Sequence, residues 1–500
     1  MALLVCLSLV AGLLTAFYYW TKKKFSYWSN KGVIGPTPLP IVGNFGTVML
    51  QQESAQLYVK KVHLKYKGEK LVGIYRGSQP VILVRDPELI KHVLIKDFNI
   101  FQDRGISTSS SRLSDNLFGA DGETWRILRQ KLTPVFTSRK LKDMIPLILK
   151  CSNSFTKYVD NLIENNVEHE IRSLTSKYTL EVIGSCAFGL DLNTVSDEEN
   201  EFSLIPKKIF KPSIYVRTLV ILDMIIPGIR KKFNTSSEIQ DFFVNLVRSV
   251  IHERKGKPSN RKDFMDLMIE LREQGKASRR KEDGVSEIEI DDVMIAAQAL
   301  VFYTAGFETS AASMSFLIHE MALNPEIQER IHDEVCRVYE KYNGELTYES
   351  TKEMPYLDMV FDETLRKYSV AGILFRKSLA DYTFPGTDVT IPKGMPVMIS
   401  ANGLNADPDY FPNPNEFNPE NFSPENKKNI PQCAYMPFGE GPRNCIGLRF
   451  AKVQSMLGTA AFFKHFKVEP SSKTKRVLEY DPKGIVLVTT HGIWVKISKR

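Results

Sequence analysis

The sequence predicts a mainly α protein with small β-sheets (α+β), preceded by one transmembrane helix. A long apolar run opens the chain, segments with helical hydrophobic periodicity dominate its body, and short β-like stretches flank these segments. Hydrophobic residues make up 43% and charged residues 25% of the 500 residues, which excludes a wholly disordered or fibrous chain.

The apolar run extends from Ala2 to Trp20 and is interrupted only by Ser8 and Thr15. A helix of this length just spans a bilayer core, at about 1.5 Å per residue. Lys22–Lys24 follow the run and no basic residue precedes it, so the positive-inside rule places the rest of the chain in the cytosol. A cleaved secretory signal is the alternative, but its usual basic n-region and small-residue cleavage site are not evident. We therefore expect residues 1–21 to form a retained membrane anchor.

Residues 22–44 are basic at first and then rich in proline. Prolines at alternate positions from Pro36 to Pro40 fix φ and remove helix donors, so the anchor helix cannot continue into the body. We expect this linker to be a stiff extended spacer between the membrane and a catalytic domain that spans residues 45–500.

The body shows no internal repeat. Periodicity predicts helices over Gly122–Leu132, Leu147–Asn165 and Asp291–Leu323, with Pro146 at the start of the second, where its missing N–H is tolerated. Strands are predicted over Leu71–Tyr75, Val81–Val84, Val389–Ile391, Pro396–Ile399 and Ile485–Thr489. The charged residues 272–290 are predicted to form a solvated surface loop. A second apolar run, Leu219–Ile226, is too short to span a bilayer. We expect a core helix there, with a patch dipping into the membrane surface as the alternative.

The charge pattern and the cysteines exclude several classes of function. The net charge of +8 is modest for this length, and no dense Lys/Arg run with interleaved aromatic residues indicates a nucleic-acid partner. The six cysteines are scattered without a CxxC pair. This spacing argues against a disulfide framework or a structural zinc site and indicates a reducing compartment.

The strongest functional signal is the segment Phe438-Gly439-Glu440-Gly441-Pro442-Arg443-Asn444-Cys445-Ile446-Gly447. Its glycines permit backbone conformations closed to other residues and let the chain approach a flat ligand closely. Nearby backbone N–H groups and Arg443 favour thiolate over thiol, and a thiolate binds iron firmly. The alternative is an inert buried cysteine in a glycine-rich turn, which this ten-residue pattern disfavours.

Phe438, Gly441, Arg443, Cys445 and Gly447 match the haem-binding signature FxxGxRxCxG, and the segment resembles that of the cytochrome P450 superfamily. The resemblance implies a cytochrome P450-like fold, haem b as the cofactor and Cys445 as the axial ligand of its iron. The other family motifs occur in the right order, so the resemblance covers nearly the entire chain.

Residues 305–310, Ala-Gly-Phe-Glu-Thr-Ser, resemble the oxygen-activating segment of the family. The resemblance implies that Ala305 and Gly306 border the haem, and that Gly306, without a side chain, leaves room for dioxygen. It further implies that Thr309 hydrogen-bonds the oxygen and that Glu308 supplies an acid for proton relay.

Four further residues are candidates for binding the haem propionates. Trp125 and Arg129 lie on one helical face and resemble the WxxxR element of the family, in which both side chains meet these carboxylates. Arg376 and Arg443 are candidates for the same role, because two carboxylates inside a protein need cationic partners.

Glu363 and Arg366 match the ExxR motif, which implies a buried ion pair that supports the haem pocket. The chain departs from the family pattern at two places. Asn421 stands where arginine is usual, so the third arm of this network rests on an amide that can still donate hydrogen bonds. Ser369-Val370 stands where the family often has prolines, so the loop from Val370 to Phe375 is expected to run differently.

Segments 101–105, 117–126 and 132–137 look like the microsomal branch shared by insect detoxification and vertebrate drug-metabolising members. The resemblance implies a monooxygenase that inserts one oxygen atom from O2 into apolar small molecules. Xenobiotics such as plant toxins or insecticides, and endogenous lipids, are the implied substrates. Electrons come from NADPH through a flavoprotein reductase, with cytochrome b5 as a second candidate partner, at the cytosolic face of the endoplasmic reticulum membrane. Basic residues expected at the docking surface, each equally interpretable as a solvated charge, are Arg126, Lys131, Arg139, Lys140 and Arg449.

Two rival functions are a haem-thiolate isomerase or dehydratase that needs no reductase, and a non-catalytic haem protein that binds small ligands. Glu308 and Thr309 disfavour the first and have no explanation under the second. Motif offsets place an apolar, partly aromatic substrate pocket around Phe118, Phe302, Ala305, Ile373, Leu374 and Ile485.

Overall fold

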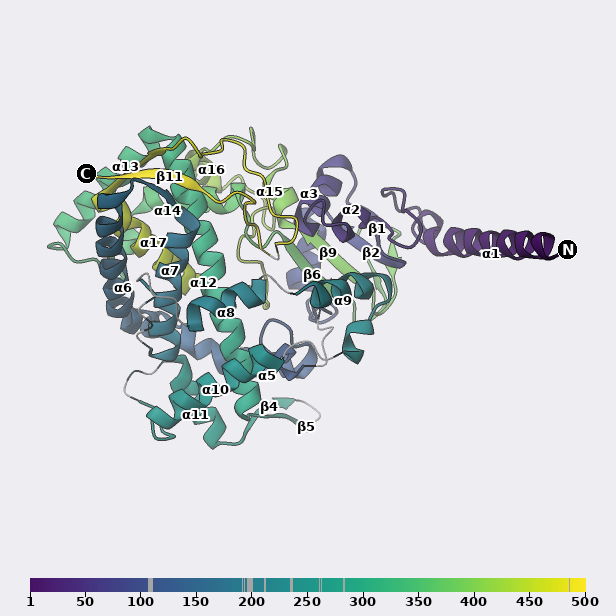
Figure 1. The fold of residues 1–500 in the computed structure, drawn as a ribbon, viewed down its shortest axis with the longest axis horizontal. Coiled ribbons are helices and arrows are strands. Elements are labelled where there is room, and N and C mark those ends of the chain that lie inside the picture. Colours follow the sequence, from purple (N-terminus) through teal and green to yellow (C-terminus); the bar gives the residue numbers. More distant parts are fainter. Residues whose placement is uncertain are drawn as a thin grey trace.

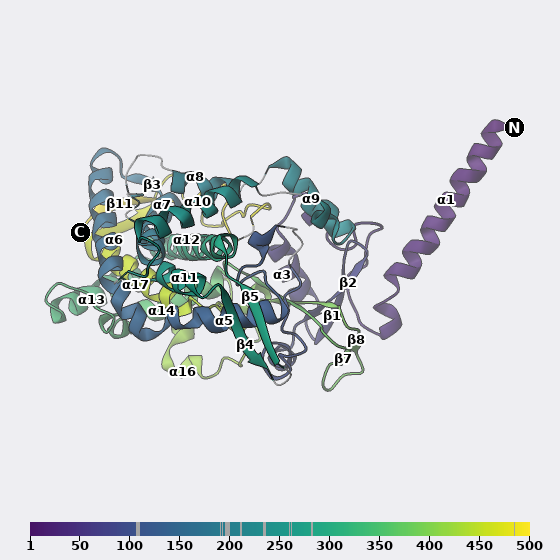
Figure 2. The ribbon, with the colours of Figure 1, turned by 90° about the horizontal axis from the view of Figure 1, so that it is seen from below.

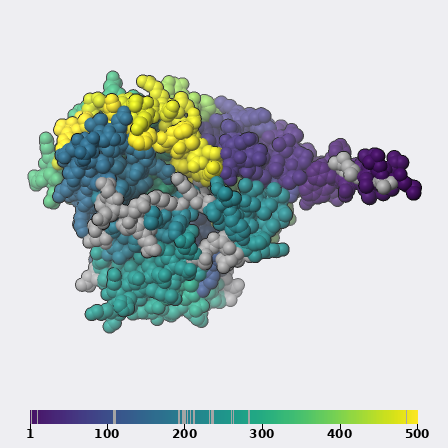
Figure 3. Space-filling view, viewed as in Figure 1, coloured from purple at the N-terminus to yellow at the C-terminus, as the bar shows by residue number. Residues whose placement is uncertain are grey.

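The computed structural model describes residues 1–106, 111–190, 192, 194–195, 201–210, 213–233, 237–259, 261, 263–281, 284–484 and 486–500. The described chain is mainly helical with small sheets, as the sequence predicts. One helix, α1, projects from the body, and a long helix, α12, crosses its middle (Figures 1 and 2). The space-filling view shows the same division between a compact body and the protruding N-terminal segment (Figure 3).

The α-helices have the following bounds: α1 Ala2–Phe25, α2 Gly46–Met49, α3 Ala55–Lys65, α4 Pro87–Lys91, α5 Gly122–Leu132, α6 Ser138–Asn165, α7 Ile171–Ile183, α8 Glu201–Phe210, α9 Ile214–Ile225, α10 Ser237–Glu253, α11 Phe264–Glu273, α12 Asp292–Leu323, α13 Pro325–Lys341, α14 Pro355–Lys367, α15 Ala401–Asn405, α16 Pro424–Lys427 and α17 Leu448–His465. The strands are β1 Leu71–Arg76, β2 Gln79–Val84, β3 Glu168–Glu170, β4 Lys276–Lys281, β5 Gly284–Glu289, β6 Ile373–Lys377, β7 Tyr382–Thr383, β8 Thr390–Ile391, β9 Pro396–Ser400, β10 Phe466–Pro470 and β11 Trp494–Lys499.

Helix α12 is the centre of the body because it is apolar on nearly every side, which requires burial all round. Asp291 caps its N-terminus by accepting a hydrogen bond from the Met294 N–H at 2.9 Å. Helices α7, α10 and α17 pack against it and form the main hydrophobic core with it. The predictions of helices over 122–132 and 291–323 are therefore confirmed, the second with Asp291 as its cap.

The largest sheet has the strand order β1-β2-β9-β6, in which β2 and β9 are parallel and the other pairs antiparallel. A second sheet has the order β10-β11-β3, and the pairs β4-β5 and β7-β8 complete the set. Four of the predicted strands are confirmed: those over 71–75, 81–84, 389–391 and 396–399. The fifth is wrong for its described part, because residues 486–489 form only an isolated bridge from Thr489 to Tyr480.

The prediction that a helix starts beside Pro146 is wrong, because α6 begins at Ser138 and contains this proline in its interior. The buried positions Leu141, Ile145 and Ile148 lie on both sides of the proline and form one apolar stripe. Packing of this stripe against the core outweighs the hydrogen bond that proline cannot donate.

The prediction of a loop over residues 272–290 is also wrong. Residues 276–281 and 284–289 pair as the antiparallel hairpin β4-β5. Lys276 forms an ion pair with Glu287 at 3.0 Å, and Arg279 forms one with Glu123 of α5 at 3.1 Å. The charged residues that indicated a solvated loop therefore form ion pairs, one across the hairpin and one with α5.

The second apolar run does not form a core helix. In α9 only Leu219 and Asp223 are buried, whereas Ile214 is 74% and Tyr215 is 53% exposed. The helix lies against the β1–β2 turn, where a Cβ at Gly77 would come within 2.2 Å of the Met224 carbonyl oxygen. Both ribbon views place α9 at the end of the body from which α1 projects.

Helix α1 extends to Phe25, so the three lysines belong to its last turn instead of the linker. In the described part of the chain, it is the one helix that is long and apolar enough to cross a membrane. The linker is not a free spacer. Trp28 is buried and donates from its indole nitrogen to the Ile74 carbonyl at 3.1 Å, and the Gly73 N–H donates to the Ile34 carbonyl at 2.9 Å. The proline-rich segment therefore packs along β1.

Candidate functional site

The segment from Phe438 to Gly447 folds into a tight loop immediately before α17. The Cys445 N–H donates to the Phe438 carbonyl at 2.8 Å, and the Asn444 N–H donates to the Gly441 carbonyl at 3.0 Å. Gly441 has a φ of 74°, and a Cβ there would lie 1.9 Å from the Leu94 carbonyl oxygen. Only glycine can occupy this position, because any side chain would collide with the backbone of the neighbouring turn.

The sulfur of Cys445 is accessible, although the residue lies at depth in the protein. Burial raises the pKa of the Cys445 thiol, while a hydrogen bond from the Gly447 N–H and the guanidiniums of Arg129 and Arg104 lower it. The net pKa shift is upward because burial outweighs these groups. The predicted contribution of a backbone N–H is confirmed at Gly447, whereas the cationic contribution comes from Arg129 and Arg104 instead of Arg443. Coordination to a metal deprotonates such a thiol outright, and the Gly447 N–H already points at the atom that would carry the charge.

Three arginines gather beside this loop. Burial and the neighbouring guanidiniums of Arg443 and Arg376 lower the pKa of Arg104 to about 9. Burial and Arg443 lower the pKa of Arg376 to about 9, and burial lowers that of Arg443 to about 10. Like charges that destabilise one another inside a protein indicate a site for an anionic group.

The hydrogen-bond donors of this arginine cluster support the same conclusion. Nε and Nη1 of Arg443, and Nε of Arg376, are buried and have no hydrogen-bond partner among the described residues. Arg443 also stacks on the Trp125 ring, with its guanidinium carbon 4.4 Å from the ring centroid. Haem b is flat and carries two carboxylates, so it fits an accessible sulfur flanked by buried guanidinium donors.

Arg129 is held differently from the other candidates for propionate binding. Its Nη1 donates to the Asn444 carbonyl at 2.8 Å and its Nη2 to the Asn444 side-chain oxygen at 2.7 Å. It therefore links α5 to the residue that precedes Cys445 and helps to fix the loop. Its predicted contact with a haem propionate stays a prediction.

The predicted oxygen-activating segment lies in the middle of α12. Ala305 is exposed although it lies within this largely buried helix, and the Thr309 hydroxyl donates to the Ala305 carbonyl at 2.6 Å. The buried Glu308 forms an ion pair with Arg172 of α7. The reason given for Gly306 is wrong, because a Cβ there would lie 2.2 Å from Cδ1 of Ile183 in α7. Its missing side chain permits close packing of two helices and does not open space beside Thr309.

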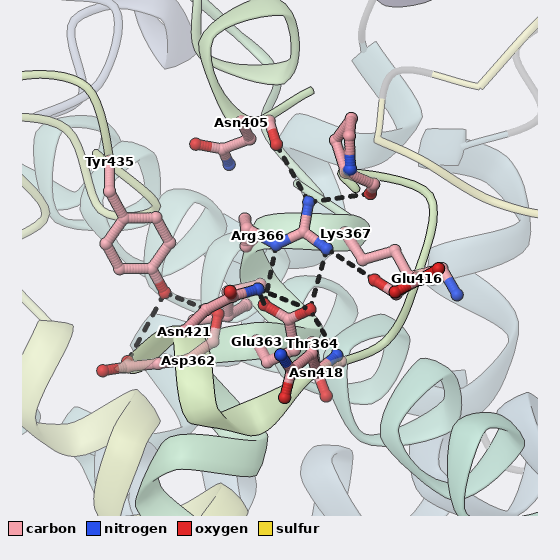
Figure 4. A network of polar contacts seen from close by, with 12 residues as sticks. Asp362, Glu363, Thr364, Arg366, Lys367, Asn405, Glu416, Asn418, Asn421 and Tyr435 are labelled. Atoms are coloured by element: carbon pink, nitrogen blue, oxygen red, sulfur yellow. Dashed lines mark hydrogen bonds and ion pairs between the residues drawn. The ribbon is translucent and has the colours of Figure 1, made fainter. Parts of the chain in front are cut away.

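Glu363 and Arg366 form a fully buried ion pair in α14, with Nε and Nη2 of Arg366 at 2.7 and 2.8 Å from the carboxylate (Figure 4). The remaining guanidinium N–H groups donate to three backbone carbonyls, those of Asn405, Pro414 and Glu416. Asn421, which stands where arginine is usual, donates its amide to both carboxylate oxygens of Glu363 at 3.4 and 3.3 Å.

Ser369-Val370 stands where prolines are often found in the family pattern. Ser369 is buried and accepts a hydrogen bond from the Asn405 amide at 2.7 Å. The Val370 carbonyl accepts from the Leu487 N–H at 3.1 Å, and Gln56 of α3 accepts from the Gly372 N–H at 2.8 Å. This loop is therefore fixed by polar side chains where the family often uses proline.

The structure places the predicted pocket residues in different surroundings. Phe118 is 53% exposed, with the Arg104 guanidinium 4.2 Å from its ring centroid, and Leu374 faces the cysteine loop, 3.8 Å from where a Gly439 Cβ would stand. Ile373 packs into a different core cluster, so the expectation that both residues line one pocket is wrong: consecutive strand residues point to opposite faces.

The partly buried Phe302 ring packs against Phe264 and Phe136 with centroids 4.4 and 5.4 Å apart, at the edge of the aromatic core. Its place in the pocket lining stays a prediction. Ile485 lies outside the described residues.

Sequence reasoning missed two charged residues of this region, Arg104 and Arg172. Arg104 belongs to a segment that resembles the family, and its Nη2 donates to the Arg443 carbonyl at 3.4 Å, but a single arginine in a loop gives no sign of burial. Arg172 is the second residue of α7, far in the sequence from Glu308, so no local pattern reveals their pairing.

Comparisons with known proteins agree with this geometry. The family model described as Cytochrome P450 matches residues 34–496. Cytochrome P450 6B1 of Papilio polyxenes is 43% identical over 509 residues, covering 100% of this chain and 99% of the relative. Cytochrome P450 6B2 of Helicoverpa armigera is 41% identical and Probable cytochrome P450 6a14 of Drosophila melanogaster is 36% identical, each over 99% of this chain and over 98% and 100% of the relative. The chain therefore belongs to the cytochrome P450 family and is a haem b-binding monooxygenase that uses O2 and electrons from a redox partner to oxidise a small molecule.

Proposed function

We propose that the chain is a membrane-anchored monooxygenase of apolar xenobiotics, in which Cys445 ligates the haem iron and an NADPH-dependent flavoprotein reductase supplies the electrons. The observation that carries this proposal is the accessible Cys445 sulfur beside Arg443 and Arg376, whose buried N–H groups lack partners among the described residues. A flat dianionic group with an iron at its centre meets both requirements.

The haem group would be held by Cys445 through its iron and by Arg104, Arg376, Arg443 and Trp125 at its carboxylate edge. When bound, it supplies the activation of O2, which no side chain of the protein can perform. The Gly447 N–H stabilises negative charge on the sulfur, and the guanidiniums neutralise the carboxylates. Phe438, Gly441 and Gly447 shape the loop so that the sulfur stays accessible.

Proton delivery is proposed for Thr309 and Glu308. The Thr309 hydroxyl donates its proton to the Ala305 carbonyl, which leaves its oxygen free to accept a hydrogen bond. Donation of its own proton to a bound group requires the hydroxyl to turn away from this carbonyl. The Glu308 carboxylate is paired with Arg172, so a relay through Glu308 requires this ion pair to open. The network of Glu363, Arg366 and Asn421 supports the site by fixing the segments around residues 405 and 414–421.

The substrate class is proposed from accessible apolar side chains and from the relatives. Phe118 and Ala305 are exposed, and Leu374 and Phe118 offer only apolar surface. The relatives above come from butterflies, moths and flies, which supports the insect xenobiotic branch and plant toxins or insecticides as substrates. Family membership favours a monooxygenase over the isomerase and the non-catalytic binding protein.

The proposed location is the endoplasmic reticulum membrane, with the catalytic domain in the cytosol. The exposed apolar helix α1 supports a single-pass anchor with basic residues on its cytosolic side. The exposed face of α9, with Ile214, Tyr215 and Ile226, offers a second apolar surface on the same side of the body.

The proposed docking surface for the reductase, and for cytochrome b5, surrounds the start of α6 and the N-terminal part of α17. Arg139 and Arg449 are exposed, and Arg449 donates to the Ser138 hydroxyl at 3.1 Å. Arg126 is largely engaged within the protein, by Gln102 and by Asn99 at 3.1 Å. Exposed cations of this kind increase the rate of association with an acidic partner.

The experiment that tests the proposal is the carbon monoxide difference spectrum of the reduced protein. Wild type and Cys433→Ala, the same change at a buried cysteine nearby in the sequence, should both give the red-shifted Soret band of thiolate-ligated haem. Cys445→Ala should fold, as far-UV circular dichroism can verify, and lack the band. A Cys445→Ala protein that keeps the band, or a haem-loaded wild type without it, would contradict the proposed ligation.

A further inference from the structure

Several backbone carbonyls of α12 between residues 305 and 311 accept hydrogen bonds from side chains of other helices. Nε2 of Gln454 in α17 donates to the Gly306 carbonyl at 3.2 Å. The Thr179 hydroxyl of α7 lies 3.1 Å from the Phe307 carbonyl and 3.0 Å from the Thr175 carbonyl of its own helix, so these two acceptors share its one proton. The Thr175 hydroxyl donates to the Ala311 carbonyl at 3.0 Å. These bonds hold the segment from two sides, α7 and α17.

The donors are themselves fixed in the core. Gln454, Thr179 and Thr175 are each fully buried. The amide of Gln454 also donates to the Ser310 hydroxyl at 2.6 Å, and its backbone carbonyl accepts from the Tyr178 hydroxyl at 2.9 Å. α7 and α17 are therefore joined to one another as well as to α12, and the donors have little freedom to follow a moving segment.

A side-chain donor on a helix carbonyl competes with the N–H four residues later, and such competition bends or widens helices locally. Here the competing donors act on consecutive carbonyls: Thr309 on Ala305, Gln454 on Gly306 and Thr179 on Phe307. Each of these three peptide groups is thus oriented by a bond from outside the regular helix ladder.

The orientation of these peptide groups determines where the Thr309 hydroxyl lies, because that hydroxyl is bonded to the first of them. Gly306 makes the arrangement possible. Without a Cβ it lets Ile183 of α7 approach α12 closely, and the same approach lets Thr179, one turn earlier on α7, reach the Phe307 carbonyl.

We propose that Thr179 and Gln454 are positioning residues that hold the Gly306 and Phe307 carbonyls and so fix the Thr309 hydroxyl for proton delivery. Thr175 extends the same restraint to Ala311. The proposal rests on the proposed role of Thr309, which is why its test includes a Thr309 variant as the reference.

The test uses the haem-loaded full chain and the variants Thr179→Val, Gln454→Leu and Thr309→Ala. Thr179→Ser keeps the hydroxyl and serves as the conservative variant. Thr459→Val is the matched control, because the buried Thr459 hydroxyl on α17 has no hydrogen-bond partner among the described residues. All variants should give the wild-type carbon monoxide difference band, which shows that haem ligation is unchanged.

The first readout is hydrogen–deuterium exchange of the ferric protein, which does not depend on turnover. Loss of one carbonyl restraint should raise amide exchange across residues 305–311 about fivefold in Thr179→Val and Gln454→Leu, the change expected for a single hydrogen bond. Thr179→Ser and Thr459→Val should exchange as wild type does. Equal exchange in all proteins, or equal increases in Thr179→Ser and Thr179→Val, would overturn the proposal.

The second readout is the fraction of consumed NADPH that is released as hydrogen peroxide in the presence of reductase and the probe 7-ethoxycoumarin. Peroxide forms when O2 takes two electrons and two protons without oxygen transfer to the probe. Thr179→Val and Gln454→Leu should raise this fraction toward that of Thr309→Ala. If Thr309→Ala alone raises it, the positioning role fails and the role of Thr309 stands. If Thr309→Ala does not raise the peroxide fraction, the proposed role of Thr309 fails. The hydrogen–deuterium exchange result alone then tests whether Thr179 and Gln454 restrain residues 305–311.

Discussion

The network around Arg366 and the cluster around Arg443 both bury guanidinium groups, but they differ in how the N–H donors are used. Every guanidinium nitrogen of Arg366 donates to Glu363 or to a backbone carbonyl. Arg443 donates through Nη2 to the Ala120 carbonyl, while its Nε and Nη1 have no hydrogen-bond partner in the described part of the chain.

This difference separates a structural charge from a binding charge. Burial of a cation is costly unless hydrogen bonds and an opposite charge offset the loss of water. For Arg366 the fold itself provides that offset, so the residue belongs to the architecture. For Arg443 the nearest carboxylate, on Asp121, is 3.6 Å away and partly exposed, so we propose that an incoming anion completes the offset.

The largest expected effect follows from removing the carboxylate that pairs with Arg366. Glu363→Gln should lower the free energy of unfolding by about 3–5 kcal/mol, because it leaves a buried guanidinium without its counter-charge. Urea unfolding followed by circular dichroism measures the change. Glu353→Gln, which breaks a surface ion pair with Lys341, is the control and should unfold close to wild type. A Glu363→Gln protein as stable as this control would mean that burial does not make the pair structural.

A smaller effect, of a different kind, is expected at Arg443. Arg443→Leu should fold, yet lose haem about 10- to 100-fold faster, because it removes one or two charge-assisted hydrogen bonds to the haem carboxylates. The transfer of haem to an excess of apomyoglobin measures this rate. Arg449→Leu, a change of an exposed arginine in α17, should transfer haem as wild type does. Wild-type haem retention in Arg443→Leu, with reduced stability, would place Arg443 in the structural class with Arg366.

The two clusters also show what the sequence can and cannot predict. The motifs identify Glu363, Arg366 and Arg443, but not which donors find partners. The carbonyls that satisfy Arg366 come from Asn405, Pro414 and Glu416, and a backbone carbonyl carries no sequence signal.

At the level of the fold, strong helical periodicity predicted helices over 122–132 and 291–323, and the structure has them at 122–132 and 292–323. The hairpin over 276–289 was missed because its strands are rich in Lys, Arg and Glu, which sequence reasoning assigns to loops. Helix α9 was expected to be a core helix because its apolar composition is the same as that of one; only the packing reveals its exposed face.

A modest effect is expected at Asn421, the departure within the structural network. Its amide donates to Glu363 at 3.3 and 3.4 Å, which are long hydrogen bonds beside the tight pair with Arg366. Asn421→Leu should therefore cost only about 1 kcal/mol of unfolding free energy, measured by urea unfolding. Asn421→Asp should cost more, because it places a second carboxylate against Glu363. If Asn421→Leu costs as much as Glu363→Gln, the amide is an essential third arm of the network.

The smallest expected effect concerns His63, a buried side chain that, unlike arginine, can lose its charge by releasing a proton. His63 is fully buried, with its Nε2 3.6 Å from Asp407, and Arg85 also faces this carboxylate. Burial lowers the pKa of His63 below its usual 6.5, so the unfolded state binds more protons as the pH falls through that value, and stability is lost in acid. Asp407, whose pKa is lowered, contributes its own change only near and below its usual value of 3.8, outside this window.

Between pH 7 and 6, wild type should therefore lose about 0.7 kcal/mol more unfolding free energy than His63→Gln, the linkage expected for one such proton. His319 and His465, whose pKa values are also lowered, are present in both proteins, so the difference isolates His63. Parallel stability curves would mean that His63 has the same pKa in the folded and unfolded states. A gain of wild-type stability on acidification would mean that the folded protein keeps His63 protonated against Asp407, and the cation would then belong with Arg366, whose charge the fold itself satisfies.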